Sequence, residues 1–97
     1  MEKLKHETIQ EKLKTLPGWS FKDNFLCKNF VFKDFSEAFG FLCRVALISE
    51  TMGHHPDWSG VYNKVNLKLS THDAGGITTL DFSFAEKVEQ LLPQQGA

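Results

Sequence analysis

The chain alternates between segments in which apolar residues recur at a helical spacing and segments in which they alternate with polar ones. In the first segment, about residues 5–15, Ile9 and Leu13 fall on one face of a helix, and the Pro17-Gly18 pair ends it. We therefore predict a short amphipathic helix near the start of the chain.

Two short stretches with strand character follow this helix. One covers residues 19–25 and the other residues 26–32, where phenylalanines recur at a period of two residues. The Asp23-Asn24 pair lies near their junction, and both residue types are common in turns because their side chains bond to the nearby backbone. We predict a turn between two strands at this pair.

A longer helix is predicted to begin at Asp34, which has capping-box spacing to Glu37 with Asp in place of Ser or Thr. It extends to about Met52, and Gly53 is well placed to end it. Its apolar surface is wider than one sheet requires, so we expect another subunit to bury part of it. One stripe consists of Phe35, Ala38, Phe39, Leu42, Ala46 and Ser49, and a second of Phe41, Val45, Ile48 and Met52.

The clearest strand signal is the alternation of apolar and polar residues over residues 61–70. A loop is predicted over residues 73–76, and residues 77–79 could extend or end a neighbouring strand. Thr78 and Asp81 repeat the capping-box spacing before a last amphipathic helix. On this pattern, Asp81 is most simply a residue of the helix start.

The predicted element order is α-β-β-α-β-β-α. Strands joined by short turns, with helices that are apolar on one side, are typical of an antiparallel sheet with one helical face. We therefore predict an α+β fold. Because the 97 residues contain no linker and no low-complexity tract, we expect residues 1–97 to form a single domain.

Composition and charge argue against several classes of function. Eleven Lys and Arg residues against twelve Asp and Glu leave a formal charge of −1, which removes the simplest electrostatic case for nucleic acid or an anionic membrane as the main partner. The longest apolar stretch, residues 38–48, is interrupted by Arg44 and falls short of the roughly 20 residues that span a membrane.

The remaining composition favours the cytoplasm. Cys27 and Cys43 lie in apolar surroundings without a CxxC pattern, so we expect both to be small buried hydrophobes rather than a disulfide. The N-terminal segment alternates in charge and lacks the apolar centre of a signal peptide. We therefore expect a cytoplasmic protein.

Most residues suited to proton chemistry fall in two short segments. Each lies at the end of a regular element, where polar side chains can reach a ligand while the framework holds them still. Only the fold or a partner subunit can bring His72 close to His54. The first segment, residues 49–58, contains Glu50, His54, His55 and Trp58, and the second, residues 70–76, contains His72 and Asp73.

Histidine is suited to proton transfer near neutral pH because its reference pKa is about 6.5. Several imidazoles around one pocket could act as acid and base, and Trp58 could provide a flat apolar wall for a planar heterocycle. Glu50, four residues before His54, could orient that ring or be a surface charge.

Simpler interpretations of the histidines stay open at this point. A His-His pair in a loop is commonly a solvated turn. A zinc site is a second alternative, although the spacing matches no HExxH or Cys/His pattern.

The same segments carry a family resemblance. The run ETMGHHPDWSGVYNKVNLKLSTHD resembles the motif E-x3-H-H-P-x-W-x-x-V-Y-N-x-V-x-h-x-L-x-T-H, in which h is apolar. This is the motif of pterin-4a-carbinolamine dehydratases, also called dimerisation cofactors of a homeodomain transcription factor. The resemblance covers about residues 32–90 and every polar position of the motif, whereas the N-terminal 15 residues match poorly.

The resemblance implies a fold and an activity. The fold is a four-stranded antiparallel sheet with three helices packed on one face, in homodimers or homotetramers. Members of the family convert 4a-hydroxytetrahydropterin (4a-hydroxytetrahydrobiopterin) to quinonoid dihydropterin and water, without a metal or cofactor, in tetrahydrobiopterin recycling. The substrate is produced by aromatic amino-acid hydroxylases.

The resemblance also implies roles for individual residues. His54 and His72 are the expected acid/base groups, and His55 is expected mainly to bind and orient the pterin. Acidic positions near the family's pocket and one tryptophan are carried over as expected substrate-binding residues. They are Glu50, Trp58, Asp73 and Asp81.

A second class of function stays open beside the enzyme. Some animal members of the family bind the dimerisation helices of a transcription factor, and the broad apolar face of the second predicted helix would suit a helical partner. This role needs no direct contact with nucleic acid. A nuclear location would accompany it, although the chain has no compact cluster of Lys and Arg.

Overall fold

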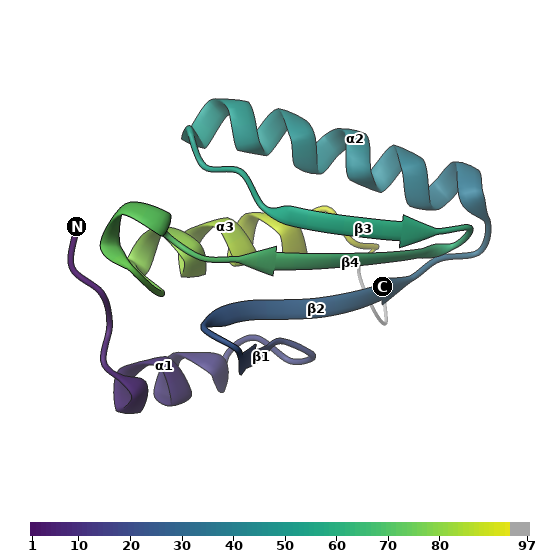
Figure 1. The fold of residues 1–97 in the computed structure, drawn as a ribbon. Coiled ribbons are helices and arrows are strands. Elements are labelled where there is room, and N and C mark those ends of the chain that lie inside the picture. The colour runs from purple at the N-terminus through teal and green to yellow at the C-terminus, as the bar shows by residue number, and fades with distance from the viewer. Residues whose placement is uncertain (94–97) are drawn as a thin grey trace.

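The computed structural model describes residues 1–93 of the 97-residue chain and has the predicted α+β fold (Figure 1). Three α-helices and four strands follow one another in the predicted order α-β-β-α-β-β-α, and one short 3-10 turn, η1, precedes the last helix. The elements are α1 (His6–Leu13), β1 (Ser20–Lys22), β2 (Phe25–Val31), α2 (Phe35–Met52), β3 (Asp57–Val61), β4 (Lys64–Leu69), η1 (His72–Ala74) and α3 (Thr79–Glu89).

The four strands form one sheet in the order β1-β2-β4-β3, and every neighbouring pair is antiparallel. The β1–β2 hairpin turns at Asp23 and Asn24, whose φ angles are 51° and 67°. Asp and Asn adopt this left-handed conformation more readily than most residues, because their short polar side chains bond locally. The turn predicted at this pair is therefore confirmed.

The second hairpin corrects the prediction of one strand over residues 61–70. β3 ends at Val61, the chain turns at Tyr62 with a φ of 52°, and β4 begins at Lys64. β3 gives no periodic signal because it is an edge strand whose five residues are all exposed. Val61 is 77% exposed, so it continues the apolar alternation of β4 in the sequence without sharing its buried face.

Residues 77–79 extend no strand, because residues 77 and 78 lie in the connection from η1 to α3 and Thr79 begins the helix. The carbonyl oxygen of Ile77 instead accepts a hydrogen bond from the amide of Leu4 at 2.7 Å, which attaches the N-terminal segment to the body of the protein. Just before them, Thr71 and Gly76 pair in an isolated antiparallel bridge. This bridge closes the loop that carries η1.

α2 begins and ends where the sequence predicts. The Asp34 carboxylate accepts a hydrogen bond from the amide of Glu37 at 2.9 Å, and the Glu37 carboxylate accepts one from the amide of Lys33 at 3.0 Å. At the other end Gly53 has a φ of 63°, a conformation that suits glycine.

Neither α2 nor any other helix among residues 1–93 is long and apolar enough to cross a membrane.

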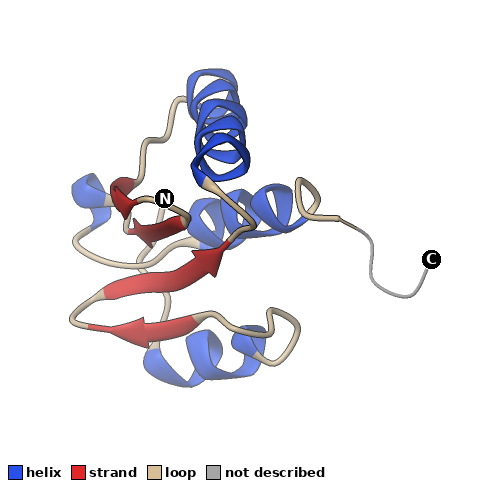
Figure 2. Cartoon of the chain, turned by 90° about the vertical axis from the view of Figure 1, so that its right-hand side faces the viewer, coloured by secondary structure: helices blue, strands red, loops and turns tan. Residues whose placement is uncertain are grey.

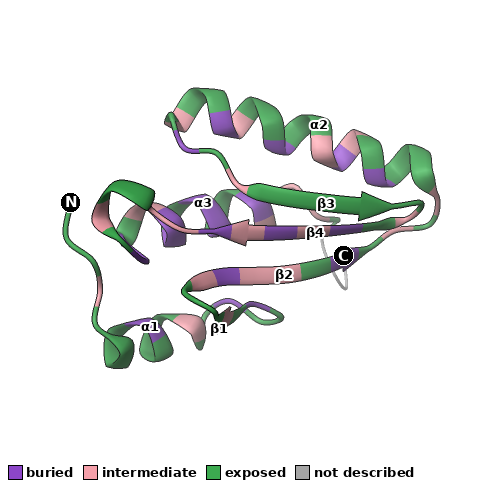
Figure 3. Cartoon of the chain, in the orientation of Figure 1, coloured by how far each residue is buried: buried purple, intermediate pink, exposed green. Residues whose placement is uncertain are grey.

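The apolar surface of α2 is only partly buried by the chain itself (Figure 3). Phe41 and Val45 face the core, whereas Phe35, Phe39 and Leu47 are exposed, the last by 69%. The prediction of an apolar surface wider than one sheet can cover is therefore confirmed.

The core lies between the helices and one face of the sheet. The buried residues of β4 are Val65, Leu67 and Leu69, which alternate along the strand and therefore share this face. α2 lies toward β3 and α1 toward β1, with α3 between them (Figure 2). The cluster also includes Ile9 of α1, Phe41 and Val45 of α2, and Phe84 and Val88 of α3.

The expectation that both cysteines are buried is wrong. Cys43 is exposed because it lies on the side of α2 that faces away from the sheet, and Cys27 is half-buried. On β2, Cys27 follows the buried Leu26 and therefore points to the open face of the sheet. Both are free thiols.

Candidate active site

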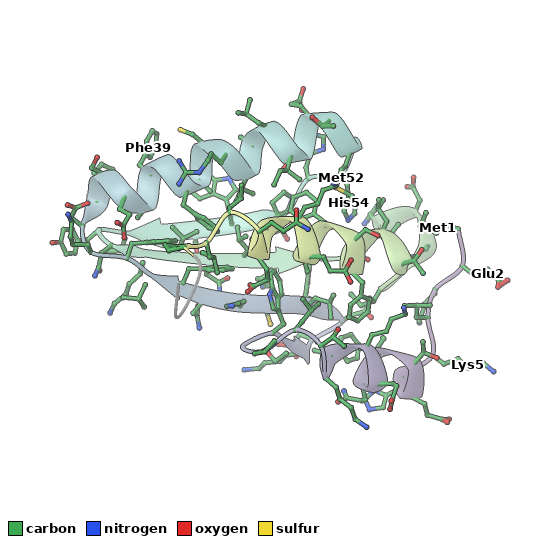
Figure 4. The ribbon with its side chains drawn as sticks, turned by 180° about the vertical axis from the view of Figure 1, so that it is seen from behind. Met1, Glu2, Lys5, Phe39, Met52 and His54 are labelled. Carbon is green, nitrogen blue, oxygen red and sulfur yellow. The ribbon has the colours of Figure 1, made fainter. Side chains whose placement is uncertain are left out.

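The loop with the two adjacent histidines follows directly from the end of α2. The left-handed conformation of Gly53 ends the helix, and the amide of His54 donates to the carbonyl of Ser49 at 3.1 Å. This reversal turns the His54 side chain inward, where its ring lies 5.9 Å from that of Phe84 on α3 (Figure 4). His54 is only 8% exposed.

His54 is anchored to a buried carboxylate. Its Nε2 lies 2.6 Å from Oδ1 of Asp81, a residue with no exposed surface. Asp81 is the third residue of α3 and completes the predicted capping box with Thr78, whose amide donates to Oδ2 at 2.9 Å. The same Oδ2 accepts a hydrogen bond from Thr71 Oγ1 at 2.8 Å. Asp81 is thus both a residue of the helix start, as predicted, and the partner of His54.

His55 faces the opposite way, toward solvent. Its Nε2 lies 2.7 Å from Glu50 Oε2, and both side chains are exposed. Glu50 therefore pairs with His55 and not with His54, the histidine considered from the spacing of four residues. Because water screens this exposed pair, it contributes little to stability.

His55 and His72 line the same pocket, which has a volume of about 380 Å³. The β3–β4 hairpin brings them together because β4 returns along β3 and places Lys68 opposite Asp57. The chain just after His55 and the chain just before His72 are therefore neighbours, so the fold unites the two segments at His55. His54, the histidine expected beside His72, does not line this pocket. The full lining is Asn24, Phe25, His55, Asp57, Lys68, Ser70, His72 and Gly75.

A second cavity, of about 370 Å³, lies on the other side of His55 between α2 and β3. Its walls are mostly apolar and include Phe39, Leu42 and Trp58, with Glu50 and His55 at its polar end. Trp58 is 57% exposed, so it does not pack beneath the histidine loop. It borders this apolar cavity and not the pocket that His72 shares with His55.

The structure does not bring Asp73 to either cavity. Asp73 lies on η1 next to His72, is exposed, and forms no side-chain hydrogen bond or ion pair within residues 1–93. Among the same residues, no three His, Cys, Asp or Glu side chains are grouped closely enough to hold a metal ion.

Several residues of the site were missed in the sequence. Lys68 lines the pocket with its Nζ 4.7 Å from the centre of the Phe25 ring. The side-chain amide of Asn24 donates a hydrogen bond to the carbonyl of Gly75 at 3.1 Å. Lys68 could have been found, because it lies two residues before Ser70 and four before His72, on the same face of an extended chain. Phe25 and Asn24 come from a distant hairpin, and nothing in the sequence links them to the histidines.

Comparison with known proteins gives the family. Residues 2–91 match the family model described as Pterin 4 alpha carbinolamine dehydratase, which extends the resemblance into the N-terminal segment. A protein of Sulfurisphaera tokodaii, provisionally named a pterin-4-alpha-carbinolamine dehydratase, is 50% identical over 92 residues, which are 95% of this chain and 99% of that protein. This chain belongs to the pterin-4a-carbinolamine dehydratase family.

Solved structures agree with this family. A transcriptional coactivator/pterin dehydratase from Brucella melitensis is similar with a TM-score of 0.91 and 38% identity, over 95% of this chain and all of that one. A pterin dehydratase-like protein, described as a RuBisCO assembly factor in the alpha-carboxysome, has a TM-score of 0.63 and 28% identity, over 75% of this chain and 84% of its own.

Proposed function

We propose that this chain converts 4a-hydroxytetrahydropterin to quinonoid dihydropterin and water by histidine acid/base catalysis, as in tetrahydrobiopterin recycling. The observation that supports the proposal is the pocket that His55 and His72 share, in a chain of this family. Its volume of about 380 Å³ lies within the roughly 300–1,000 Å³ of small-molecule sites.

The reaction needs one proton delivered and one removed. The hydroxyl on C4a leaves as water once an acid protonates its oxygen, while the lone pair of the neighbouring N5 forms the C4a–N5 double bond. A base then takes the proton from N5, which leaves the neutral quinonoid product. Each well-placed acid or base contributes about 10²–10⁴-fold to such a rate.

We assign the two proton transfers to His55 and His72, because both line the pocket. We propose that Glu50 orients the His55 ring through the contact with its Nε2. This assignment moves His55 from the binding role that the resemblance implied to an acid/base role. His54, which the resemblance implied as an acid/base group, lines neither cavity and is held by Asp81 through Nε2, so we assign it no proton transfer.

Two other expected substrate-binding residues lie outside the pocket that His55 and His72 share. Trp58 borders the apolar cavity on the other side of His55, so we assign it no contact with a pterin bound in the shared pocket. Asp73 faces solvent away from the pocket, so we assign it no contact with the pterin.

The test is the dehydration rate of freshly generated 4a-hydroxytetrahydropterin, followed by ultraviolet absorbance. We expect the wild-type protein to accelerate dehydration and His72→Ala to reduce the catalysed rate by about 10²-fold or more. His6→Ala is the matched control, since His6 lies on α1 outside the pocket. Equal rates with and without the folded protein would refute the proposal.

We also propose that the chain forms homodimers or homotetramers through the exposed apolar side of α2. The exposure of Phe35, Phe39 and Leu47 supports this proposal, because large exposed apolar side chains gathered on one helix are commonly covered by a partner. A helix of a transcription factor is the alternative occupant, which the coactivator name of the Brucella melitensis protein brings into consideration. Molar mass by light scattering distinguishes a monomer from a homo-oligomer.

We propose a cytoplasmic location for this activity. Both cysteines are free and one is exposed, which suits a reducing compartment. A nuclear pool would accompany the transcription-factor alternative. Fluorescence microscopy of the tagged chain in its source cells would contradict the proposal if the signal lay outside the cytoplasm.

A further inference from the structure

The Asp81 carboxylate is held by a chain of hydroxyl groups that the proposed mechanism does not use. Thr78 Oγ1 accepts a hydrogen bond from the Leu80 amide at 3.2 Å and lies 2.7 Å from Thr71 Oγ1, which lies 2.8 Å from Asp81 Oδ2. A carboxylate only accepts hydrogen bonds, so Thr71 donates its one hydroxyl proton to Asp81. Thr78 then donates its own proton to Thr71.

The Asp81 carboxylate, as an acceptor, determines where His54 carries its proton. Asp81 Oδ2 already accepts from Thr71 and from the Thr78 amide, which leaves Oδ1 for His54 Nε2 at 2.6 Å. Nε2 therefore holds a proton, and when the ring is neutral Nδ1 is its unprotonated nitrogen. Within residues 1–93, Nδ1 has no hydrogen-bond partner. It keeps some exposed surface, since every fully buried side-chain nitrogen or oxygen among these residues has a partner.

Thr71 also holds the turn that carries His72. Its carbonyl accepts hydrogen bonds from the amides of Ala74 and Gly75, at 3.0 and 3.1 Å, and Thr71 is the N-cap residue directly before η1. One residue thus contacts the carboxylate partner of His54 through its side chain and supports the turn of His72 through its backbone.

We propose that Thr71 is a positioning residue of the dehydratase site. Its hydroxyl keeps Asp81 directed at His54, which holds the His54 ring and its Nε2 proton in place beside His55, while its backbone holds the turn of His72. The inference rests on the proposed function for its catalytic consequence, whereas the geometry of His54 can be measured in the free protein.

The first test compares Thr71→Val, which removes the hydroxyl and keeps the shape, with Thr71→Ser, which retains the hydroxyl. Thr15→Val is the matched control, because the Thr15 hydroxyl donates to a backbone carbonyl at the surface, at 2.9 Å. The readout is nitrogen-15 NMR of the histidine rings together with proton exchange at His54 Nε2. Where Thr71→Val does not fold, Thr71→Ala replaces it.

We expect the wild type, Thr71→Ser and Thr15→Val to show His54 as the Nε2–H tautomer with slow exchange of that proton. Thr71→Val should exchange it roughly tenfold faster, because the carboxylate has lost one of its donors. An Nδ1–H tautomer in the wild type, or exchange at the wild-type rate in Thr71→Val, would overturn the proposal.

Dehydration rates then separate this proposal from the proposed function. With an active wild type, we expect Thr71→Val to lower kcat roughly tenfold with KM nearly unchanged, and Thr71→Ser to recover most of it. Full kcat in Thr71→Val would overturn the positioning role. If the wild type does not accelerate dehydration, the proposed function fails, and the ring spectra still determine whether Thr71 fixes the His54 tautomer.

Discussion

Two adjacent histidines face opposite sides of one loop, and this difference separates their chemistry. His54 is turned inward by the end of α2 and is bound to Asp81, whereas His55 faces solvent beside Glu50. The sequence places both rings in the loop but cannot give their directions, because these depend on Asp81, which is 27 residues away.

Removal of the buried carboxylate should destabilise the fold. We expect Asp81→Ala to lower the free energy of unfolding by about 3 kcal/mol, since it leaves His54, Thr71 and the Thr78 amide without their acceptor. Denaturant titration followed by circular dichroism measures this change. The control is Asp73→Ala, an exposed carboxylate that should cost less than about 0.5 kcal/mol. Equal losses in the two variants would contradict the role given to Asp81.

Among the helices and strands, the sequence predicts best those ends and turns that are determined by residues close to them in the chain. α2 is correctly bounded because Asp34 and Gly53 act at its ends, and the β1–β2 turn because Asp23 and Asn24 suit its geometry. β3 is not predicted, since an exposed edge strand has no apolar alternation, and Tyr62 is not a residue that signals a turn.

The turn at Tyr62 provides a test of this explanation. Its φ of 52° is unfavourable for a residue with a Cβ atom, so Tyr62→Gly should be more stable than Tyr62→Ala by about 1 kcal/mol. The alanine variant is the matched control because it loses the same aromatic ring and keeps the strain. Thermal unfolding of the two variants measures the difference, and a glycine variant no more stable than the alanine one would contradict the strained turn.

At the scale of the whole molecule, the site depends on a contact that the sequence conceals. The β3–β4 hairpin brings His72 to His55, and the β1–β2 turn adds Asn24 and Phe25 to the same pocket. The histidines were predicted from their residue type and the family motif, but their shared pocket follows only once β3 is known. The exposed apolar side of α2 is a second feature that concerns the whole molecule, because we propose that it carries self-association.

A charge placed on that side should disrupt self-association. Leu47 is 69% exposed, and we expect Leu47→Glu to shift the molar mass toward the 11.0 kDa of one chain while helix content is kept. Ser83→Glu adds the same charge to an exposed position of α3 and should leave the mass unchanged. A wild-type monomer, or an oligomer that survives Leu47→Glu, would contradict association through α2.

The most direct test of the shared His55–His72 site is a double-mutant cycle on kcat/KM for dehydration of 4a-hydroxytetrahydropterin. The variants are His55→Ala, His72→Ala and the combination of the two. If both imidazoles act on one pterin in one pocket, we expect large losses in the single variants and a combined loss within about tenfold of the larger one. Losses that multiply would show that the two histidines act independently. Wild-type activity in either single variant would contradict the shared site.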